Sequence, residues 1–190
     1  AMVEDTDAPR RPARLMRADG SLIAHGSASA KVDDGGEVRH RLASRRPSEP
    51  ARMLAAVAPG LVLGPMDVQV AAAGVEERLP LLTELLPEHR ASATGACSAP
   101  LSTAIHAMRA CESALPLAWP LGVGLFGAIE WQWLYGPMGV DRPYQGTARV
   151  LATGTSPRSE MLWTEAAMRD AAAGRDVTRM LMLSRLLKQG

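Results

Sequence analysis

Apolar and polar residues alternate in two different ways in the second half of the chain. Between residues 100 and 115, apolar side chains recur every three or four positions, which predicts a helix with one continuous apolar stripe. Residues 121–134 begin with glycines and then alternate, with Ile129, Trp131 and Trp133 on one face and Glu130 on the other. Because a period of two is typical of strands, we expect a slender helix followed by a long two-sided strand.

Strand-like patterns continue to the C-terminus over residues 146–155, 160–170 and 177–188. Their connections are short, which favours antiparallel neighbours. The last run also fits helical spacing, but we interpret it as the final edge strand of the sheet. Upstream, residues 61–70 predict a strand interrupted by Gly64 and Pro65, as edge strands often are, and residues 50–57 and 75–86 predict short helices.

The N-terminal quarter differs in composition from the rest of the chain. Residues 1–12 are charged and proline-bearing, which predicts a flexible tail, and residues 13–46 carry two turn signals between three weak strand patterns. The third of these patterns covers residues 37–44. We therefore predict a β-meander over 13–46 and a main domain over 51–190, in which an antiparallel sheet wraps around a central helix. The fold class is α+β.

Composition and charge exclude several classes of function. The chain has 190 residues, 47% of them hydrophobic and 4% aromatic, with a formal net charge of +1. No basic cluster is interleaved with aromatic residues, so we expect no nucleic-acid partner. No apolar run reaches the roughly 18 residues of a membrane span, and the first residues lack a signal-peptide pattern, so we expect no membrane association and a cytoplasmic location.

Familiar cofactor motifs are missing from the sequence. It contains no phosphate-binding loop, no dinucleotide fingerprint, no nucleophile elbow and no histidine pair at metal spacing, so we expect neither a metal nor a bound cofactor. The remaining candidates are Glu84 and His89 in the segment TELLPEH, which precedes an irregular loop and then the predicted central helix. A carboxylate and an imidazole that share a water molecule are sufficient for acid/base catalysis.

The order of these elements resembles the MaoC-like hydratase and dehydratase branch of the hot dog superfamily, whose members act on acyl thioesters. The resemblance covers roughly residues 55–188 and depends on TELLPEH, on the slender helix and on GAIEWQWLYGPMGVDRPY. It places Glu84 at the family's catalytic aspartate, Leu86 at its asparagine, Pro87 at its proline and His89 at its histidine. It also implies a homodimer and a substrate carried on coenzyme A or an acyl carrier protein.

The leading hypothesis is therefore an enoyl-thioester hydratase or dehydratase with Glu84 and His89 as catalytic residues. We expect Gly95, Cys97 and Ser98 to bind the thioester carbonyl at the start of the central helix, where unpaired N–H groups and the helix dipole polarise it. Glu130 and Trp131 are the expected substrate-binding residues of the long strand. Two alternatives remain open: a thioesterase, and a non-catalytic acyl-binding subunit, which Leu86 in the asparagine position favours.

Overall fold

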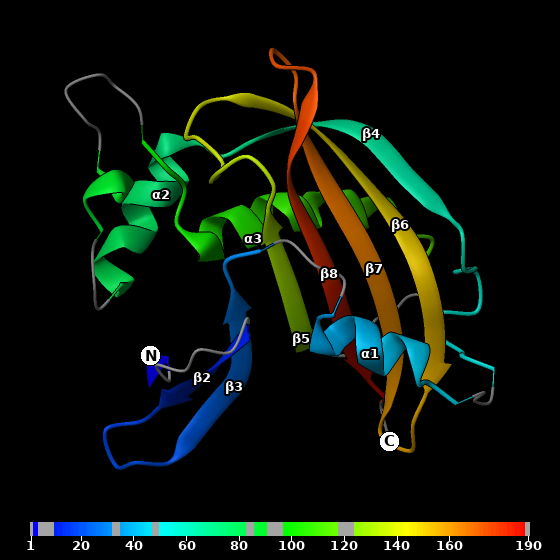
Figure 1. Cartoon of the computed structure of the whole chain (residues 1–190). Coiled ribbons are helices and arrows are strands. Elements are labelled where there is room, and N and C mark those ends of the chain that lie inside the picture. The colour runs from blue at the N-terminus through cyan, green and yellow to red at the C-terminus, as the bar shows by residue number, and fades with distance from the viewer. Residues whose placement is uncertain are drawn as a thin grey trace.

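Two separate sheets organise the molecule. The computed structural model describes residues 2–3, 10–31, 35–46, 50–82, 86–90, 97–117 and 124–188. A three-stranded sheet has the order β1-β2-β3, and a five-stranded antiparallel sheet has the order β4-β6-β7-β8-β5 (Figure 1). The small sheet comprises β1 (Met2–Val3), β2 (Arg10–Met16) and β3 (Leu22–Ser29). The large sheet comprises β4 (Val62–Gln69), β5 (Gly124–Trp133), β6 (Pro143–Thr155), β7 (Ser159–Asp170) and β8 (Arg175–Leu187).

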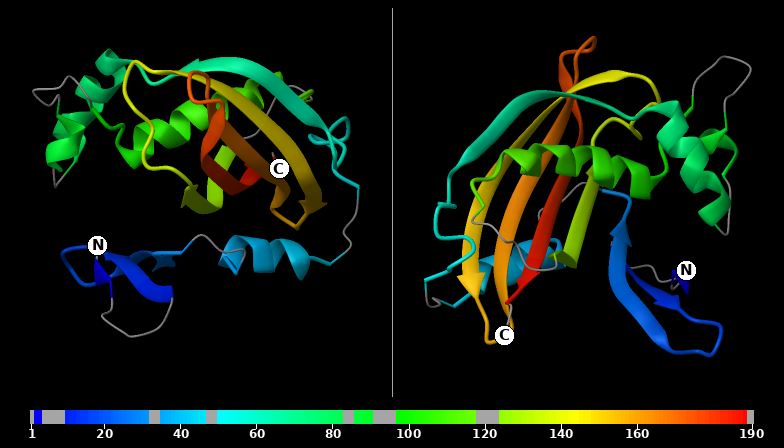
Figure 2. Two further views of the ribbon diagram at one scale, coloured as in Figure 1. Left: turned by 45° about the horizontal axis from the view of Figure 1, so that its top comes forward. Right: turned by 180° about the vertical axis from the view of Figure 1, so that it is seen from behind.

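Helices lie on both faces of the large sheet. On one face lies α3 (Leu101–Arg109), extended by the 3-10 helix η3 (Ala110–Ala114). On the opposite face lies α1 (Glu37–Ala43), and the curved strands pass between the two (Figure 2). Beside the start of α3 lie α2 (Ala72–Arg78), the 3-10 helix η1 (Leu79–Leu81) and the 3-10 helix η2 (Pro87–His89). The sheet therefore separates an α3 face from an α1 face.

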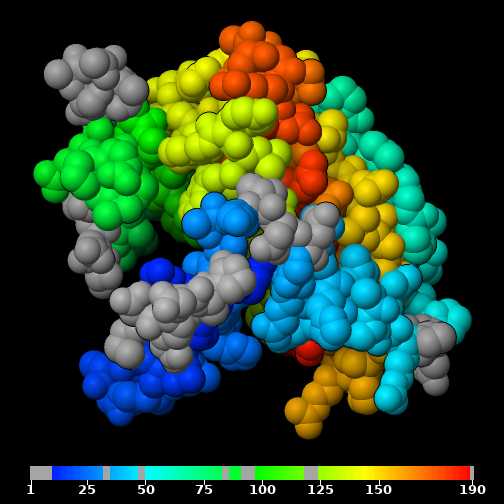
Figure 3. Space-filling model, in the orientation of Figure 1, coloured from blue at the N-terminus to red at the C-terminus, as the bar shows by residue number. Residues whose placement is uncertain are grey.

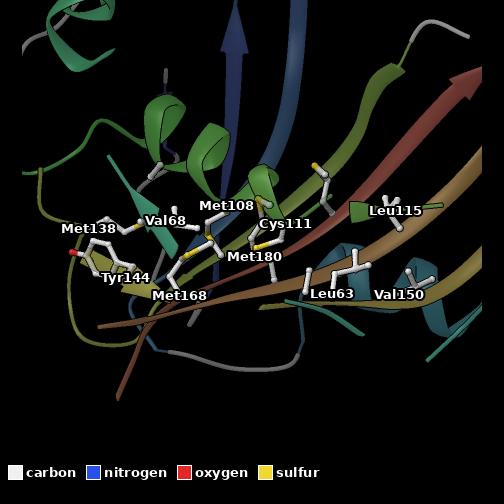
Figure 4. Packing of buried hydrophobic residues seen from close by; sticks show 14 of the residues in the cluster. Leu63, Val68, Met108, Cys111, Leu115, Met138, Tyr144, Val150, Met168 and Met180 are labelled. Atoms are coloured by element: carbon white, nitrogen blue, oxygen red, sulfur yellow. The ribbon is translucent and has the colours of Figure 1, made fainter. Parts of the chain in front are cut away.

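Most of the core lies between α3 and the sheet. Met108 and Cys111 are fully buried there, against Met168 and Met180 of the sheet (Figure 4). Unbranched methionine side chains adapt to irregular gaps, which suits the contact of a helix with a strongly curved sheet. A smaller cluster on the α1 face buries Val38 against Trp163, Leu181 and Leu183. The long strands β7 and β8 are thus buried on both faces.

The predicted large sheet is confirmed, including the antiparallel pairing of β6, β7 and β8 and the edge position of β4. The prediction that residues 177–188 form the final edge strand is wrong. β8 lies between β7 and β5, and β5 forms that edge instead. The apolar residues that suggested helical spacing face both sides of an interior strand, since Met180 and Met182 face α3 whereas Leu181 and Leu183 face α1.

The strand predicted over residues 37–44 is also wrong, because this segment is the helix α1. Val38 and Leu42, four positions apart, pack against the apolar patch of the sheet, and Arg41 forms an ion pair with Glu37. Helical spacing brings these pairs together, whereas a strand would not. The segment is helical because burial of its apolar side chains on that patch outweighs its weak alternating pattern.

The third strand of the small sheet is β1, which lies in the range predicted as a flexible tail. The predicted tail over residues 1–12 is thus wrong for Met2–Val3 and for the first residues of β2. The β2–β3 hairpin itself is confirmed and is separate from the large sheet (Figure 1).

Turns replace the short helix predicted over residues 50–57. The buried carboxylate of Glu160 accepts hydrogen bonds from the amides of Arg52 at 2.7 Å and Leu54 at 3.0 Å. A side chain of the sheet thus fixes two backbone amides of the turns. These hydrogen bonds offset the cost of burying the carboxylate. The helix predicted over residues 75–86 agrees better with the structure. Its first part lies in α2 and η1, and Pro80 falls in η1.

We predict that Gly146→Ala destabilises the protein by about 1–3 kcal/mol through overpacking. A Cβ atom at Gly146 would lie 2.7 Å from Sγ of Cys111 and 2.9 Å from Cε of Met168, so β6 and η3 would have to separate. Urea denaturation measures the free energy of unfolding. Gly26→Ala is the matched control, because nothing lies within 4 Å of its added Cβ. Equal stabilities of the two variants would contradict this account of the helix–sheet contact.

Candidate active site at the start of helix α3

A short bridge fixes the segment that leads into α3. Ser98 forms an isolated β-bridge with Gly139, and the amide of Val140 donates to the carbonyl of Cys97 at 2.8 Å. The hydroxyl of Tyr144 in turn accepts a hydrogen bond from the amide of Gly139 at 2.7 Å. The loop after β5 therefore anchors the entrance of α3 to the sheet.

A pocket of about 300 Å³ lies beside this entrance. Its described lining is mainly apolar and includes Leu82, Leu86, His89, Pro100, Leu101 and Ser102. Ligand sites typically combine such an apolar lining with few polar groups. His89 and the start of α3 supply the polar groups here.

His89 is half-buried and held in one orientation. Its Nδ1 lies 3.2 Å from the carbonyl oxygen of Ser98. A carbonyl only accepts hydrogen bonds, so Nδ1 must carry the proton in this contact. In the neutral ring Nε2 is then unprotonated, and it is the atom that can accept a proton.

Cys97 lies close to His89 but contacts its backbone. The thiol donates to the carbonyl oxygen of His89 at 3.2 Å. Burial raises the pKa of Cys97, and the negative charge of Asp141 raises it further. Cys97 therefore remains a thiol at neutral pH, and the contact is not a cysteine–histidine nucleophile pair.

The start of α3 offers backbone donors at different positions from those expected. The amide of Ser98 is already hydrogen-bonded to the carbonyl of Glu88 at 2.8 Å. The N-cap residue is Pro100 rather than Ser98, and no side chain caps the helix. The first amides of a helix have no intrahelical partner. Leu101 and Ser102, which line the pocket, carry these amides.

The two candidates from β5 lie apart from His89. Glu130 belongs to the α1 face, where its carboxylate accepts a hydrogen bond from Nε of Arg39 at 3.3 Å. Trp131 packs against the core on the α3 face and makes an edge-to-face contact with Trp133, with ring centroids 6.2 Å apart. Neither residue belongs to the described lining of the pocket.

Glu84 and Gly95 lie outside the described residues, and so does Thr83. Of the seven residues predicted for the site, the structure thus brings together His89, Cys97 and Ser98. The amides of Leu101 and Ser102 were missed as donors, although the helix start predicted at Pro100 was the signal that could have located them.

Within the described ranges, no group of three or more His, Cys, Asp or Glu side chains is placed to hold a metal ion. None of the described helices is long and apolar enough to cross a membrane.

The fold, in contrast to the sequence, has clear relatives. No protein-family model matches the sequence, and neither does any curated protein. Among solved structures, the chain is similar to the monoamine oxidase regulatory protein from Archaeoglobus fulgius, with a TM-score of 0.56 and 12% identity over 74% of this chain and 97% of that one. The chain has the hot dog fold.

Two further solved structures share this fold. A MaoC-like dehydratase from Rhodospirillum rubrum has a TM-score of 0.50 and 17% identity over 74% of this chain and 99% of that one. The C-terminally truncated HadBC complex of Mycobacterium tuberculosis, a 3R-hydroxyacyl-ACP dehydratase, has a TM-score of 0.52 and 11% identity over 74% and 100%. The hot dog fold that the sequence resemblance implied is confirmed, with α3 as the central helix.

We predict that Cys97 reacts more slowly with iodoacetamide at pH 8 than a free cysteine peptide does. Its raised pKa leaves less thiolate, which is the reactive form, and the rate rises as the pH passes above the ordinary thiol value of 9.0. Peptide mapping by mass spectrometry follows Cys97 separately from the buried Cys111. The urea-unfolded chain is the control and reacts like the peptide. A folded chain that reacts as fast would contradict the burial argument.

Proposed function

We propose that this protein binds an acyl thioester in the pocket beside α3 and adds or removes water at an enoyl thioester. The observation that carries the proposal is His89, oriented by the Ser98 carbonyl and lining an apolar pocket at a helix start. Such a pocket suits an acyl chain, and an imidazole whose Nδ1 is held by a carbonyl leaves Nε2 for proton transfer.

The chemistry needs two proton-transferring groups and a polarised carbonyl. In hydration, one group takes a proton from water while the water oxygen forms a bond to the β-carbon. The other group delivers a proton to the α-carbon. His89 and Glu84 are the proposed pair. The amides of Leu101 and Ser102 would donate to the thioester oxygen, where negative charge develops.

The structural relatives support this choice among hot dog activities. Two of the similar chains are described as a MaoC-like dehydratase and as a 3R-hydroxyacyl-ACP dehydratase. We extend both the reaction and the carrier, coenzyme A or an acyl carrier protein, to this chain as part of the proposal, together with a cytoplasmic location.

Leu86 favours a second candidate, a non-catalytic acyl-binding subunit. It occupies the position of the family's asparagine and lines the pocket with an apolar side chain. An apolar group there adds contact with an acyl chain but offers no hydrogen bond to water or substrate. A thioesterase is the third candidate, with Glu84 or Glu130 activating water.

We further propose a homodimer formed through the edge strand β5. Leu125, Phe126 and Trp133 of this strand are large, apolar and about half exposed. Among the described strands β5 pairs with β8 alone, so its other side is an edge of the kind that proteins commonly cover. The HadBC relative is a complex of such subunits.

We predict that His89→Ala lowers kcat for hydration of crotonyl-CoA by about 10²–10⁴-fold, because it removes a general acid/base group. Glu84→Gln should lower kcat by a similar factor. Loss of the enoyl ultraviolet absorbance measures the rate. His25→Ala, an exposed histidine of the β2–β3 hairpin, is the matched control and should leave kcat unchanged.

Three outcomes separate the candidates. Full hydration activity of His89→Ala would rule out the site assignment. Release of free thiol from butyryl-CoA, without hydration of crotonyl-CoA, would indicate the thioesterase. Saturable butyryl-CoA binding that His89→Ala weakens, with no turnover of either substrate, would indicate the binding subunit.

We predict that Trp133→Glu converts the dimer into a monomer, because a charge introduced into an apolar interface opposes its burial. Light scattering during size-exclusion chromatography measures the mass. The control Leu81→Glu introduces the same charge at an apolar side chain that is 78% exposed on η1, and it should leave the dimer intact. A monomeric wild-type chain would contradict the proposed interface.

A further inference from the structure

A second pocket lies on the α1 face of the sheet. Its volume is about 330 Å³, and its walls come from α1 with the residues after it, from β6, β7 and β8. Figure 3 shows α1 lying over this face beside β6 and β7. The sheet separates this pocket from the one beside α3, so it is independent of the proposed acyl site.

Arginine dominates the polar part of this pocket. Its lining includes Arg41, Arg45, Arg46 and Arg185, and no acidic residue belongs to the described lining. Arg185 comes from β8, so side chains from two separate elements bring positive charge to one cavity. Collecting four guanidinium groups in one place costs electrostatic free energy unless a negative charge offsets it.

Local contacts neutralise only part of the positive charge of these arginines. Arg41 is paired with Glu37, and Nη1 of Arg45 donates to the carbonyl of Leu42 at 3.0 Å near the end of α1. The Arg45 contact complements the C-terminal end of the helix dipole. Within the described part of the chain, no carboxylate pairs with Arg46 or Arg185, and both side chains are exposed.

The floor of the pocket is apolar. Met161, Trp163 and Leu183 of the sheet line it. Trp163 is 4% exposed, and its Nε1 has no hydrogen-bond partner among the described residues. A ligand that fits both parts carries more than one negative charge at one end and an apolar or flat group at the other.

We propose that this pocket binds a small organic diphosphate. The planar guanidinium groups of Arg46 and Arg185 hold the phosphate oxygens, because arginine matches phosphate with pairs of hydrogen bonds. The apolar part of the ligand lies on the apolar floor, where the Met161 side chain is partly exposed. Free nucleotides and coenzyme A both contain the diphosphate, and binding experiments distinguish these two sources.

Isothermal titration calorimetry of the full chain tests the proposal with ADP, coenzyme A, inorganic pyrophosphate and adenosine. We expect one binding site per chain for ADP, weaker binding of pyrophosphate, no binding of adenosine, and affinity that falls with added salt. An affinity for coenzyme A that is well above that for ADP and that Arg185→Gln reduces would identify the coenzyme as the source. An affinity for ADP above that for coenzyme A would identify a free nucleotide, and both results support a diphosphate site.

Matched variants locate the binding. Arg46→Gln and Arg185→Gln should each weaken ADP binding by about tenfold, through the loss of charge-assisted hydrogen bonds. Arg185→Lys, which keeps the charge but loses the planar fork, should weaken it less. Arg17→Gln, with the same charge change in the exposed β2–β3 turn, should have no effect.

Three results would overturn the proposal: no binding of ADP or pyrophosphate at low salt, equal binding of adenosine and ADP, or equal weakening by Arg17→Gln and Arg185→Gln. Circular dichroism of each variant confirms that the chain is folded. Loss of ADP binding in a folded Arg185→Gln variant is then an effect on the site, whatever the activity of the pocket beside α3.

Discussion

Close packing of α3 and η3 against the curved sheet is the contact on which the rest of the molecule depends. Gly146 has no side chain, so Cys111 approaches the backbone of β6, and methionines from β7 and β8 fill the remaining space. The position of the helix axis then sets where its first turn lies. Since the pocket beside α3 is built on that first turn, the geometry of the candidate site follows from the packing of the core.

The sheet separates two kinds of chemistry. On the α3 face a single imidazole lines an apolar pocket, which suits an uncharged acyl chain. On the α1 face arginines surround an apolar floor, which suits an anion. Glu130 belongs to the second face through Arg39, and that guanidinium also donates to Glu165 at 2.9 Å. The carboxylate of Glu130 therefore holds α1 against the sheet through Arg39.

Strands with strict alternation and a helix with a clear apolar stripe were predictable from the sequence, because burial on a defined face imposes those periods. The segment of α1 was not, since its conformation depends on an apolar patch made by Trp163, Leu181 and Leu183, which are distant in sequence. The same reason explains the turns at 52–56, which the Glu160 carboxylate holds. Within the candidate site, His89 was predicted from its motif, and the structure places it in the lining of the pocket. The orientation of its ring depends on Ser98, whose position the bridge to Gly139 sets.

The position of α1 has a consequence for assembly. Because α1 covers Trp163, Leu181 and Leu183, a second sheet cannot stack face to face on that surface without first displacing the helix. Face-to-face stacking of large sheets is thereby blocked on the α1 side by the chain itself, and α3 occupies the other side. Direct contact between the sheets of two copies is then left to the edge strands and the hairpin.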